Sequence, residues 1–424
     1  MGRTSGALPA PGEFMKVALL TLGCRVNQSE SDVIEGSLRA GGMTIVDLNE
    51  KPDFCIVNTC TVTAKGDYNS RQLIRRAAKT GAKVIVTGCY AQLRPQEAES
   101  ISGVVSVVRN ENKYEIGQLL SDGPTPLHFG NCSRSRPYLK VQDGCNFRCS
   151  YCAVPRARGK SRSVPVDEVM ERVREIVSGG YKEIVLTGIH LGTYGHDLPE
   201  KTALSKLVKK ILHDSDIHRI RLSSLEVSEV DDELIEIFQD GRICKHLHIP
   251  LQSGSDRVLK LMKRTYTAGQ YGRRVEAIVS RTDNLSLGTD IIVGFPGEED
   301  GDFAATHSLI SDLPFSYLHI FPFSVRTDTE ASRLAKKVSD STVRERLAKM
   351  KSLQGVKKEA YLEAQIDREL EIIAEERLNA EMVIGTSGNY LKVRALSRSQ
   401  KEGTVATVRP QSIVEGALYG AVIG

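Results

Sequence analysis

The chain has 424 residues, of which 40% are hydrophobic and 26% are charged. Its length exceeds the ~100 to 200 residues of an ordinary domain, which excludes a single small module and predicts two or three domains. The composition excludes a disordered chain, and no apolar run approaches the ~18 residues that would span a bilayer. Residues 1–14 lack the apolar core of a signal peptide and are interpreted as a flexible leader or tag. We therefore expect a soluble, cytoplasmic protein with no membrane partner.

Charge is distributed unevenly, although the net charge is only +4 from 57 basic and 53 acidic residues. Residues 133–163 hold eight Lys or Arg and one Asp, and residues 331–361 hold nine basic and three acidic side chains. Such stretches suit nucleic-acid phosphates, but a solvated surface has the same composition. The charge pattern alone leaves both interpretations open.

Residues 15–125 alternate short β-branched runs with helical patterns, as in MKVALLT, NQSESDVIEGSLRAG and FCIVNT. This alternation predicts an α/β domain with a parallel sheet covered by helices, of the flavodoxin-like kind. Residues 126–137, rich in Pro, Gly and Ser with their neighbours, are predicted to be a linker.

A longer strand and helix alternation follows over residues 138–362. Its six strand patterns, from YLKVQ to YLHIFPF, predict a partial (β/α)6 barrel. An amphipathic helix is expected from Ser341 to Leu362. Residues 363–424 contain five short alternating runs, which predict a small all-β barrel.

The most specific motif is Cys145, Cys149 and Cys152 in DGCNFRCSYC. Zinc sites usually show two separated cysteine pairs or a closing histidine, and ferredoxins a fourth nearby cysteine. Three thiolates can instead hold three irons of a [4Fe-4S] cluster and leave the fourth iron open to a small molecule. The spacing resembles that of the radical S-adenosylmethionine (SAM) superfamily, and the alternative is a structural metal knuckle.

A second set of cysteines is dispersed: Cys24, Cys60 and Cys89 each lie just past a predicted parallel strand. The carboxyl ends of such strands form the ligand crevice of an open α/β sheet, so the three thiols are expected to converge and to hold a second cluster. The alternative, small buried thiols used in packing, is preferred for Cys55, Cys132 and Cys244. Cysteine use without an export signal also favours metal binding over disulfides.

Together, the two cysteine sets, the α/β domain, the barrel and the β tail resemble the methylthiotransferase family of radical SAM enzymes from Met15 onward. The tail resembles the TRAM domain, an RNA-binding β-barrel. The segment Cys24-Arg25-Val26-Asn27-Gln28 resembles the branch that acts on tRNA carrying N6-threonylcarbamoyladenosine. The resemblance implies two [4Fe-4S] clusters and SAM as cofactors.

The resemblance also implies a SAM site across the barrel. The backbone of Tyr151 is expected to meet the adenine, and Gly179 with Gly180 to face the methionine amino group. The glycine pair also serves as a helix stop before the next strand, and both roles can hold. Glu226, past a strand end, would accept hydrogen bonds from a ribose or an ammonium group, unless it is simply a surface acid. Two further motifs match the family, and their expected cofactor contacts are Gln252, Ser255, Gly294, Phe295 and Pro296.

Four cations follow the first cysteine set, and we expect them to bind the backbone of a tRNA anticodon stem-loop: Arg156, Arg158, Lys160 and Arg162. Some of them could instead neutralise the carboxylate of SAM. Lys392, Arg394 and Arg409 in the β tail could extend the track, with Tyr390 available for stacking. For the tail residues, a solvated face is an equally good interpretation.

By the resemblance, the first cluster, once reduced, cleaves SAM to a deoxyadenosyl radical, and a second SAM methylates a sulfur carried on the second cluster. The radical then removes hydrogen from C2 of the modified adenine at position 37, where the methylthio group is added. His190, His246 and His248 could assist, but polar packing is the preferred interpretation. The chain is expected to be a monomer that needs an electron donor such as flavodoxin or ferredoxin and a sulfur source.

Three alternatives to this function remain open at this point. The enzyme could act on isopentenyladenosine in tRNA or on a ribosomal protein, or the chain could be a non-catalytic iron–sulfur or zinc protein that binds RNA.

Overall fold

The computed structural model describes residues 15–121 and 134–424. The predicted leader 1–14, residues 126–133 of the predicted linker and Cys132 lie outside these ranges. The described chain forms two compact units. One holds residues 15–121 together with 156–158, and the other holds residues 134–155 together with 159–424.

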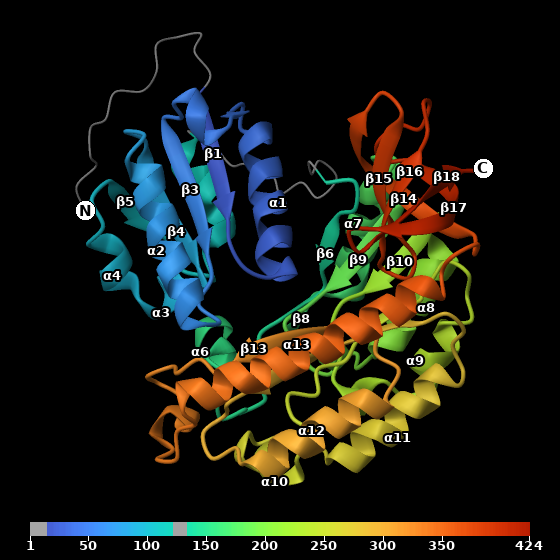
Figure 1. Ribbon diagram of the computed structural model, residues 1–424. Helices are drawn as coiled ribbons and strands as arrows, with labels where there is room; N and C mark the ends of the chain where they lie inside the picture. The colour runs from blue at the N-terminus through green and yellow to red at the C-terminus, as the bar shows by residue number, and fades with distance from the viewer. Residues whose placement is uncertain (1–14, 122–133) are drawn as a thin grey trace. The chain divides into compact units, whose positions relative to one another are not determined.

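The first unit is a parallel sheet of five strands in the order β2-β1-β3-β4-β5 (Figure 1). This order is the flavodoxin-like one, which confirms the predicted fold class. The strands are β1 (Lys16–Thr21), β2 (Thr44–Ile45), β3 (Phe54–Thr59), β4 (Lys83–Gly88) and β5 (Val104–Val107). The helices are α1 (Arg25–Ala40), α2 (Ala64–Ala78), α3 (Cys89–Leu93), α4 (Pro95–Glu99) and α5 (Ile116–Leu120), with short 3-10 turns at Leu48–Glu50 and Lys113–Glu115.

Strand β3 lies in the middle of this sheet and is buried on both faces. Val57 packs with Ile74 of α2, whereas its neighbour Ile56 packs with Ile34 of α1. Successive side chains of a strand point to opposite faces, so α1 and α2 cover opposite faces of the sheet. Cys55 lies in the same cluster as Val57 and is fully buried, in agreement with the packing role expected for it.

The second unit begins with six parallel strands, each predicted from the sequence. They form two three-stranded sheets, β10-β9-β6 and β11-β12-β13, which a bridge between Ile220 and Ile243 connects. Within the described residues β6 and β13 do not pair, so the barrel is partial, as expected. The strands are β6 (Tyr138–Lys140), β9 (Glu183–Thr187), β10 (Arg219–Leu222), β11 (His246–His248), β12 (Ser286–Val293) and β13 (Tyr317–Pro322).

Helices between these strands bury their apolar stripes against the sheets in one continuous core. They are α7 (Val166–Ser178), α8 (Leu204–Asp214), α9 (Asp232–Ile237), α10 (Asp256–Leu261), α11 (Ala268–Val279) and α12 (Asp300–Asp312). A two-stranded ribbon flanks the first cysteine set, with β7 (Gln142–Asp143) before it and β8 (Arg162–Ser163) after it, and the short helix α6 (Val154–Arg158) directly follows the cysteines. Further 3-10 turns are Leu191–Thr193, Val227–Glu229 and Glu330–Arg333.

Helix α13 (Asp340–Glu363) is capped by Ser339, whose side chain accepts a hydrogen bond from the Thr342 backbone N–H. It buries Met350 against the core and leads to a closed five-stranded barrel, so the predicted helix and β tail are both confirmed. The strands are β14 (Leu370–Asn379), β15 (Met382–Ser387), β16 (Lys392–Leu396), β17 (Val405–Val414) and β18 (Ala417–Val422). None of the helices in the described ranges is long and apolar enough to cross a membrane.

Buried charges join the tail barrel to the α/β part of the second unit. Glu183 of β9 is fully buried and accepts hydrogen bonds from Arg219 Nε at 2.6 Å and Arg221 Nε at 2.8 Å. Arg136 reaches the same carboxylate at 3.2 Å, and Arg221 also donates to the carbonyl of Ser387 on β15 at 2.9 Å. Although burial acts to raise it, these guanidinium groups hold the pKa of Glu183 well below its usual range.

Candidate functional site

The dispersed cysteines of the first unit converge, as expected. Cys60 follows β3 and Cys89 follows β4 directly, and the last residues of these two strands are register partners. A Cβ atom placed on Gly23 would lie 3.1 Å from the sulfur of Cys60, so the loop that carries Cys24 touches Cys60. Burial raises the pKa of the Cys60 thiol to about 11, and the nearby thiols of Cys89 and Cys24 add to the rise.

Asn27 and two glycines hold these loops in place. The Asn27 amide donates to the carbonyls of Leu22 at 2.8 Å and Thr59 at 2.9 Å, which ties the residues before Cys24 and Cys60 together. Gly88 has φ +94°, and a Cβ there would lie 2.4 Å from the Thr59 carbonyl oxygen. Gly23 has φ +107°, so both positions require glycine.

Arg158 corrects one of the predictions. Its guanidinium is buried and donates to Glu30 Oε1 at 2.8 Å and to Asn27 Oδ1. Lys113 Nζ lies 2.5 Å from the other oxygen of Glu30, and all three charged side chains are buried. Arg158 is therefore committed to Glu30 and cannot reach an RNA phosphate, contrary to the expectation from the basic run.

The first cysteine set lies on one loop of the second unit, between β7 and α6. Gly144, directly before Cys145, has φ +74°, and a Cβ there would lie 2.0 Å from the Lys160 carbonyl oxygen. This position at the start of the loop therefore requires glycine. Backbone N–H groups point at two sulfur atoms, Phe147 N to Cys145 Sγ and Val154 N to Cys152 Sγ, both at 3.4 Å. Burial raises the pKa of the Cys152 thiol to about 12.

This donor set suits a cluster better than a single ion. Among the described residues, neither cysteine set gathers three sulfur atoms within 4.8 Å of one another, as the ligands of one zinc ion would. A cluster instead distributes its thiolates over separate irons, and N–H donors to sulfur are a usual means of tuning it. The described cysteines are also free of disulfides. The residues present therefore fit a [4Fe-4S] cluster, which weakens the zinc-knuckle alternative.

A chain of polar groups leads away from Cys145. His190 Nδ1 lies 3.5 Å from Cys145 Sγ, and its Nε2 forms an ion pair with Glu229. Phe147 packs on the imidazole at a centroid distance of 4.4 Å. Burial acts to lower the pKa of His190, but hydrogen bonds with Cys145 and Glu229 raise it to about 10. These contacts with Cys145, Glu229 and Phe147 go beyond the packing role expected from the sequence.

A second buried pair lies beside Cys149. Arg264 Nη1 donates to Cys149 Sγ at 3.5 Å, and its Nη2 is paired with Glu226. The guanidinium also lies 4.9 Å over the ring of Tyr266. Glu226 is therefore not the surface acid that the sequence left open, and its carboxylate already has a cation. The sequence analysis missed Arg264, Glu229 and Tyr266, because each is a single residue far along the chain from the cysteines.

The glycine pair Gly179 and Gly180 is a second correction. Both residues are exposed and stand at the amino end of β9, where they close α7, and a Cβ on Gly180 would meet nothing within 4 Å. The cysteine loop and His190 follow the carboxyl ends of their strands, so this pair lies at the wrong edge to face a cofactor. The glycine at the right edge is Gly188, where a Cβ would lie 2.9 Å from Gln142 Oε1.

The remaining residues that are predicted to contact SAM follow β11 and β12. Gln252 has φ +70° and donates its N–H to the Asp290 carbonyl at 2.8 Å, whereas Ser255 caps the start of α10 and donates its hydroxyl to Asp302 at 2.6 Å. The ring of Phe295 is fully buried, and Tyr151 packs edge-on against it at 6.5 Å. Gly294 and Pro296 flank Phe295 in the same buried turn. The Gly294 N–H already donates to Glu298 Oε2 at 2.8 Å, and a Cβ on Gly294 would lie 2.5 Å from a methyl group of Val343.

The predicted RNA-facing cations divide into two groups. Arg156, Lys160 and Arg162 are exposed on the segment after the cysteine loop. In the tail, Lys392, Arg394 and Arg409 are each paired with a glutamate. Tyr390 packs against His246 at 4.3 Å and under Arg221 at 5.2 Å, so its ring is engaged inside the second unit rather than available for stacking.

Two family models match the chain. The radical SAM superfamily covers residues 139–310, and the uncharacterized protein family UPF0004 covers residues 16–109. Among solved structures, the radical SAM methyltransferase TsrM from Kitasatospora setae, with cobalamin and a [4Fe-4S] cluster bound, has a TM-score of 0.56 at 15% identity. That likeness covers 76% of this chain and 77% of the other and shows the fold.

Curated relatives extend over nearly the whole chain. The threonylcarbamoyladenosine tRNA methylthiotransferase MtaB of Aquifex aeolicus is 39% identical over 90% of this chain and 96% of its own length. The MtaB protein of Bacillus subtilis is 36% identical over 93% of each. The tRNA-2-methylthio-N(6)-dimethylallyladenosine synthase of Sulfurimonas denitrificans is 30% identical over 96% of this chain and 99% of its own length. The chain therefore belongs to the methylthiotransferase family of radical SAM enzymes, which work with [4Fe-4S] clusters and SAM.

Proposed function

We propose that this protein adds a methylthio group to C2 of N6-threonylcarbamoyladenosine at position 37 of tRNA. The observation that carries the proposal is the match to MtaB enzymes at 36% to 39% identity over at least 90% of the chain. The relative that is named for dimethylallyladenosine is less similar, at 30% identity. The convergence of Cys24, Cys60 and Cys89 in one unit supports a second cluster in addition to the one proposed for the Cys145 loop.

In this proposal, Cys145, Cys149 and Cys152 hold the first cluster with SAM, and Cys24, Cys60 and Cys89 hold the second. When bound, these groups supply the one-electron chemistry and the sulfur that substitution at an unactivated C–H bond requires. The chain's own residues provide charge and orientation. Arg264 and His190 place cations beside two of the thiolates, and Glu226 and Glu229 fix those cations. The electron donor and the sulfur source are external.

We expect replacement of His190 by Ala to make the midpoint potential of the first cluster more negative by about 60 mV. This is the one-electron equivalent of a lost hydrogen bond of about 1.4 kcal/mol to a charged thiolate. The donor stabilises the reduced, more negative cluster more than the oxidised one, which sets the sign. Redox titration followed by electron paramagnetic resonance (EPR) measures the shift. Glu229→Gln keeps a partner for the ring and should shift the potential less, and an unchanged potential in both variants would contradict the assignment.

The exposed cations Arg156, Lys160 and Arg162 are proposed to bind the anticodon-stem backbone. Replacing all three with Ala should weaken tRNA binding and reduce the slope of log affinity against log salt by ~0.7 to 0.9 for each lost phosphate contact. Filter binding at several salt concentrations measures both quantities. The matched control is Arg281→Ala, an exposed arginine paired with Asp232, and equal losses in both proteins would refute this RNA face.

The substrate is tested by mass spectrometry of nucleosides from tRNA of cells with and without the gene. The proposal predicts loss of the methylthio form of threonylcarbamoyladenosine, accumulation of its precursor, and restoration by the wild-type gene. Loss of methylthio-isopentenyladenosine instead would keep the family and overturn the substrate. If neither nucleoside changes, a tRNA substrate is refuted, and a mass increase on a ribosomal protein becomes the outcome to seek.

A further inference from the structure

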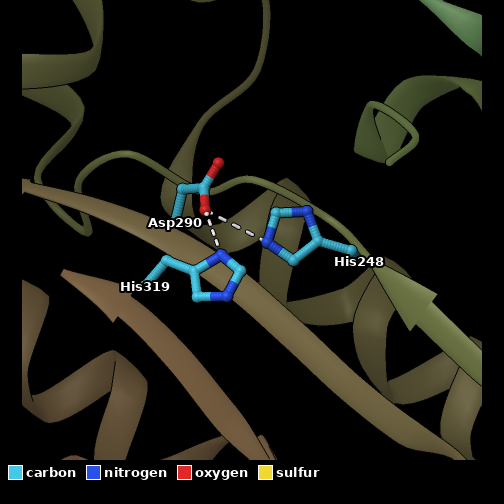
Figure 2. A group of neighbouring side chains, drawn as sticks. All are labelled: His248, Asp290 and His319. Carbon is cyan, nitrogen blue, oxygen red and sulfur yellow. Dashed lines mark hydrogen bonds and ion pairs between the residues drawn. The ribbon is translucent and has the colours of Figure 1, made fainter. Parts of the chain in front are cut away.

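Two histidines and an aspartate from three adjacent strands meet in the second unit (Figure 2). His248 ends β11, Asp290 lies in β12 and His319 lies in β13. Asp290 and His319 are direct register partners, so their side chains leave the sheet on the same face. One nitrogen or oxygen atom from each residue lies within 4.8 Å of the other two, an arrangement that no other trio of such residues in the described ranges shares.

The distances converge on one oxygen atom. His248 Nε2 lies 3.1 Å and His319 Nδ1 lies 3.2 Å from Asp290 Oδ1. Within the described residues, His248 Nε2 is buried yet lacks a hydrogen-bond partner of good geometry, although the residue is only 6% exposed. A buried polar atom of this kind normally has a partner, and an ion that all three side chains coordinate would supply one.

The surroundings orient His248 as a ligand. Its other ring nitrogen, Nδ1, lies 2.8 Å from Ser224 Oγ, which leaves Nε2 to face the group. Metal-binding histidines use their second nitrogen in the same way. The Asp290 carbonyl accepts from the Gln252 N–H at 2.8 Å, so the backbone that carries the carboxylate is fixed too. His319 is 53% exposed in its side chain, so one side of the group is open to solvent.

We propose that His248, Asp290 and His319 bind a divalent first-row transition metal ion that is separate from the iron–sulfur clusters. Two imidazoles and one carboxylate are the donor set of mononuclear sites that keep open positions, and the set contains no thiolate. The open positions would lie on the side of His319, where water or an oxygen atom of a bound molecule would complete the shell. The proposal stands on these three residues and does not require the proposed substrate.

Titration of the reconstituted holoenzyme with Mn²⁺ tests the site, because thiolates and sulfide are poor ligands for this ion whereas nitrogen and oxygen donors accept it. Free Mn²⁺ is counted by its EPR signal. We expect one ion per chain in the wild type. Asp290→Asn and His319→Ala should raise the dissociation constant by about tenfold or more. Ser224→Ala should raise it by about tenfold, since loss of a residue that orients a ligating histidine typically costs 10- to 100-fold in metal affinity.

The matched control is His213→Ala, because His213 forms a surface pair with Asp214 at 2.6 Å but has no second imidazole beside it. This variant should bind Mn²⁺ as the wild type does. Circular dichroism and the cluster absorbance show that each variant is folded, and the exposed position of His319 makes that variant the safer one. The proposal is overturned if the wild type takes up no Mn²⁺, or if Asp290→Asn and His319→Ala bind it with wild-type affinity.

Discussion

The Cys149→Ala variant should make no methylthiolated tRNA while still binding tRNA. Cys149 is one of three thiols on a single loop, and Arg264 donates to its sulfur at 3.5 Å. Its loss would remove one of the three thiolates that are proposed to hold the first cluster. Iron analysis of the reconstituted protein should fall from about eight to about four atoms per chain, the content of one [4Fe-4S] cluster. Nucleoside mass spectrometry and filter binding measure the other two quantities.

The control for this experiment is Cys55→Ala, a fully buried cysteine inside β3 that packs in the sheet core. This variant should keep its iron and its activity, because Cys55 points into a hydrophobic cluster. Methylthiolation by Cys149→Ala at the wild-type rate would exclude the radical mechanism. Equal iron loss from both variants would show that the effect comes from folding and not from ligation.

Replacing Glu183 by Ala should destabilise the second unit by about 3 to 5 kcal/mol, the largest effect expected away from the cysteines. The change leaves Arg219 and Arg221 buried without their carboxylate and weakens the contact between β9 and the tail barrel. Urea unfolding followed by circular dichroism measures the loss. The control is Glu371→Ala, a 41% exposed partner of Arg219, which should cost less than about 1 kcal/mol. Similar losses in both variants would show that the buried network has no special weight.

The contact of Glu183 with Arg219 and Arg221 is sensitive to acid. The pKa of Glu183 lies below its usual range in the folded state, so the stabilisation is fully present above the unfolded value of ~4.3. This stabilisation is lost progressively as the pH falls below that value, because the unfolded chain then binds a proton at this carboxyl while the folded chain does not. The difference in unfolding free energy between wild type and Glu183→Gln should therefore shrink below about pH 4 and stay constant between about pH 6 and 8.

Both cysteine sets could be predicted because their signals are local. Cys145, Cys149 and Cys152 follow one spacing, and Cys60 and Cys89 each follow a strand that its β-branched run already defines. The order of those strands then brings the thiols together. The short strands β2 and β5 were not predicted, since Thr44–Ile45 and Val104–Val107 are too brief to show a pattern.

Pairings between distant segments could not be predicted. Arg158 belongs to a basic run that is typical of an RNA-facing loop, yet its partner Glu30 lies 128 residues earlier in α1. The contact between Cys145 and His190 likewise extends to Glu229, which follows β10, whereas His190 follows β9. Gly179 and Gly180 end α7 before β9, as the helix-stop alternative expects, and the structure shows that both residues are exposed at the amino end of that strand.

The most direct test of the central claim is a single turnover on a tRNA anticodon stem-loop whose threonylcarbamoyladenosine carries deuterium at C2. The reconstituted enzyme, SAM and a reductant are mixed without oxygen, and nucleosides and small molecules are analysed by mass spectrometry. The account predicts a methylthio nucleoside without deuterium at C2 and a matching amount of deuterium in 5′-deoxyadenosine. Methylthiolation with no deuterium in 5′-deoxyadenosine, or product only from isopentenyladenosine, would contradict it.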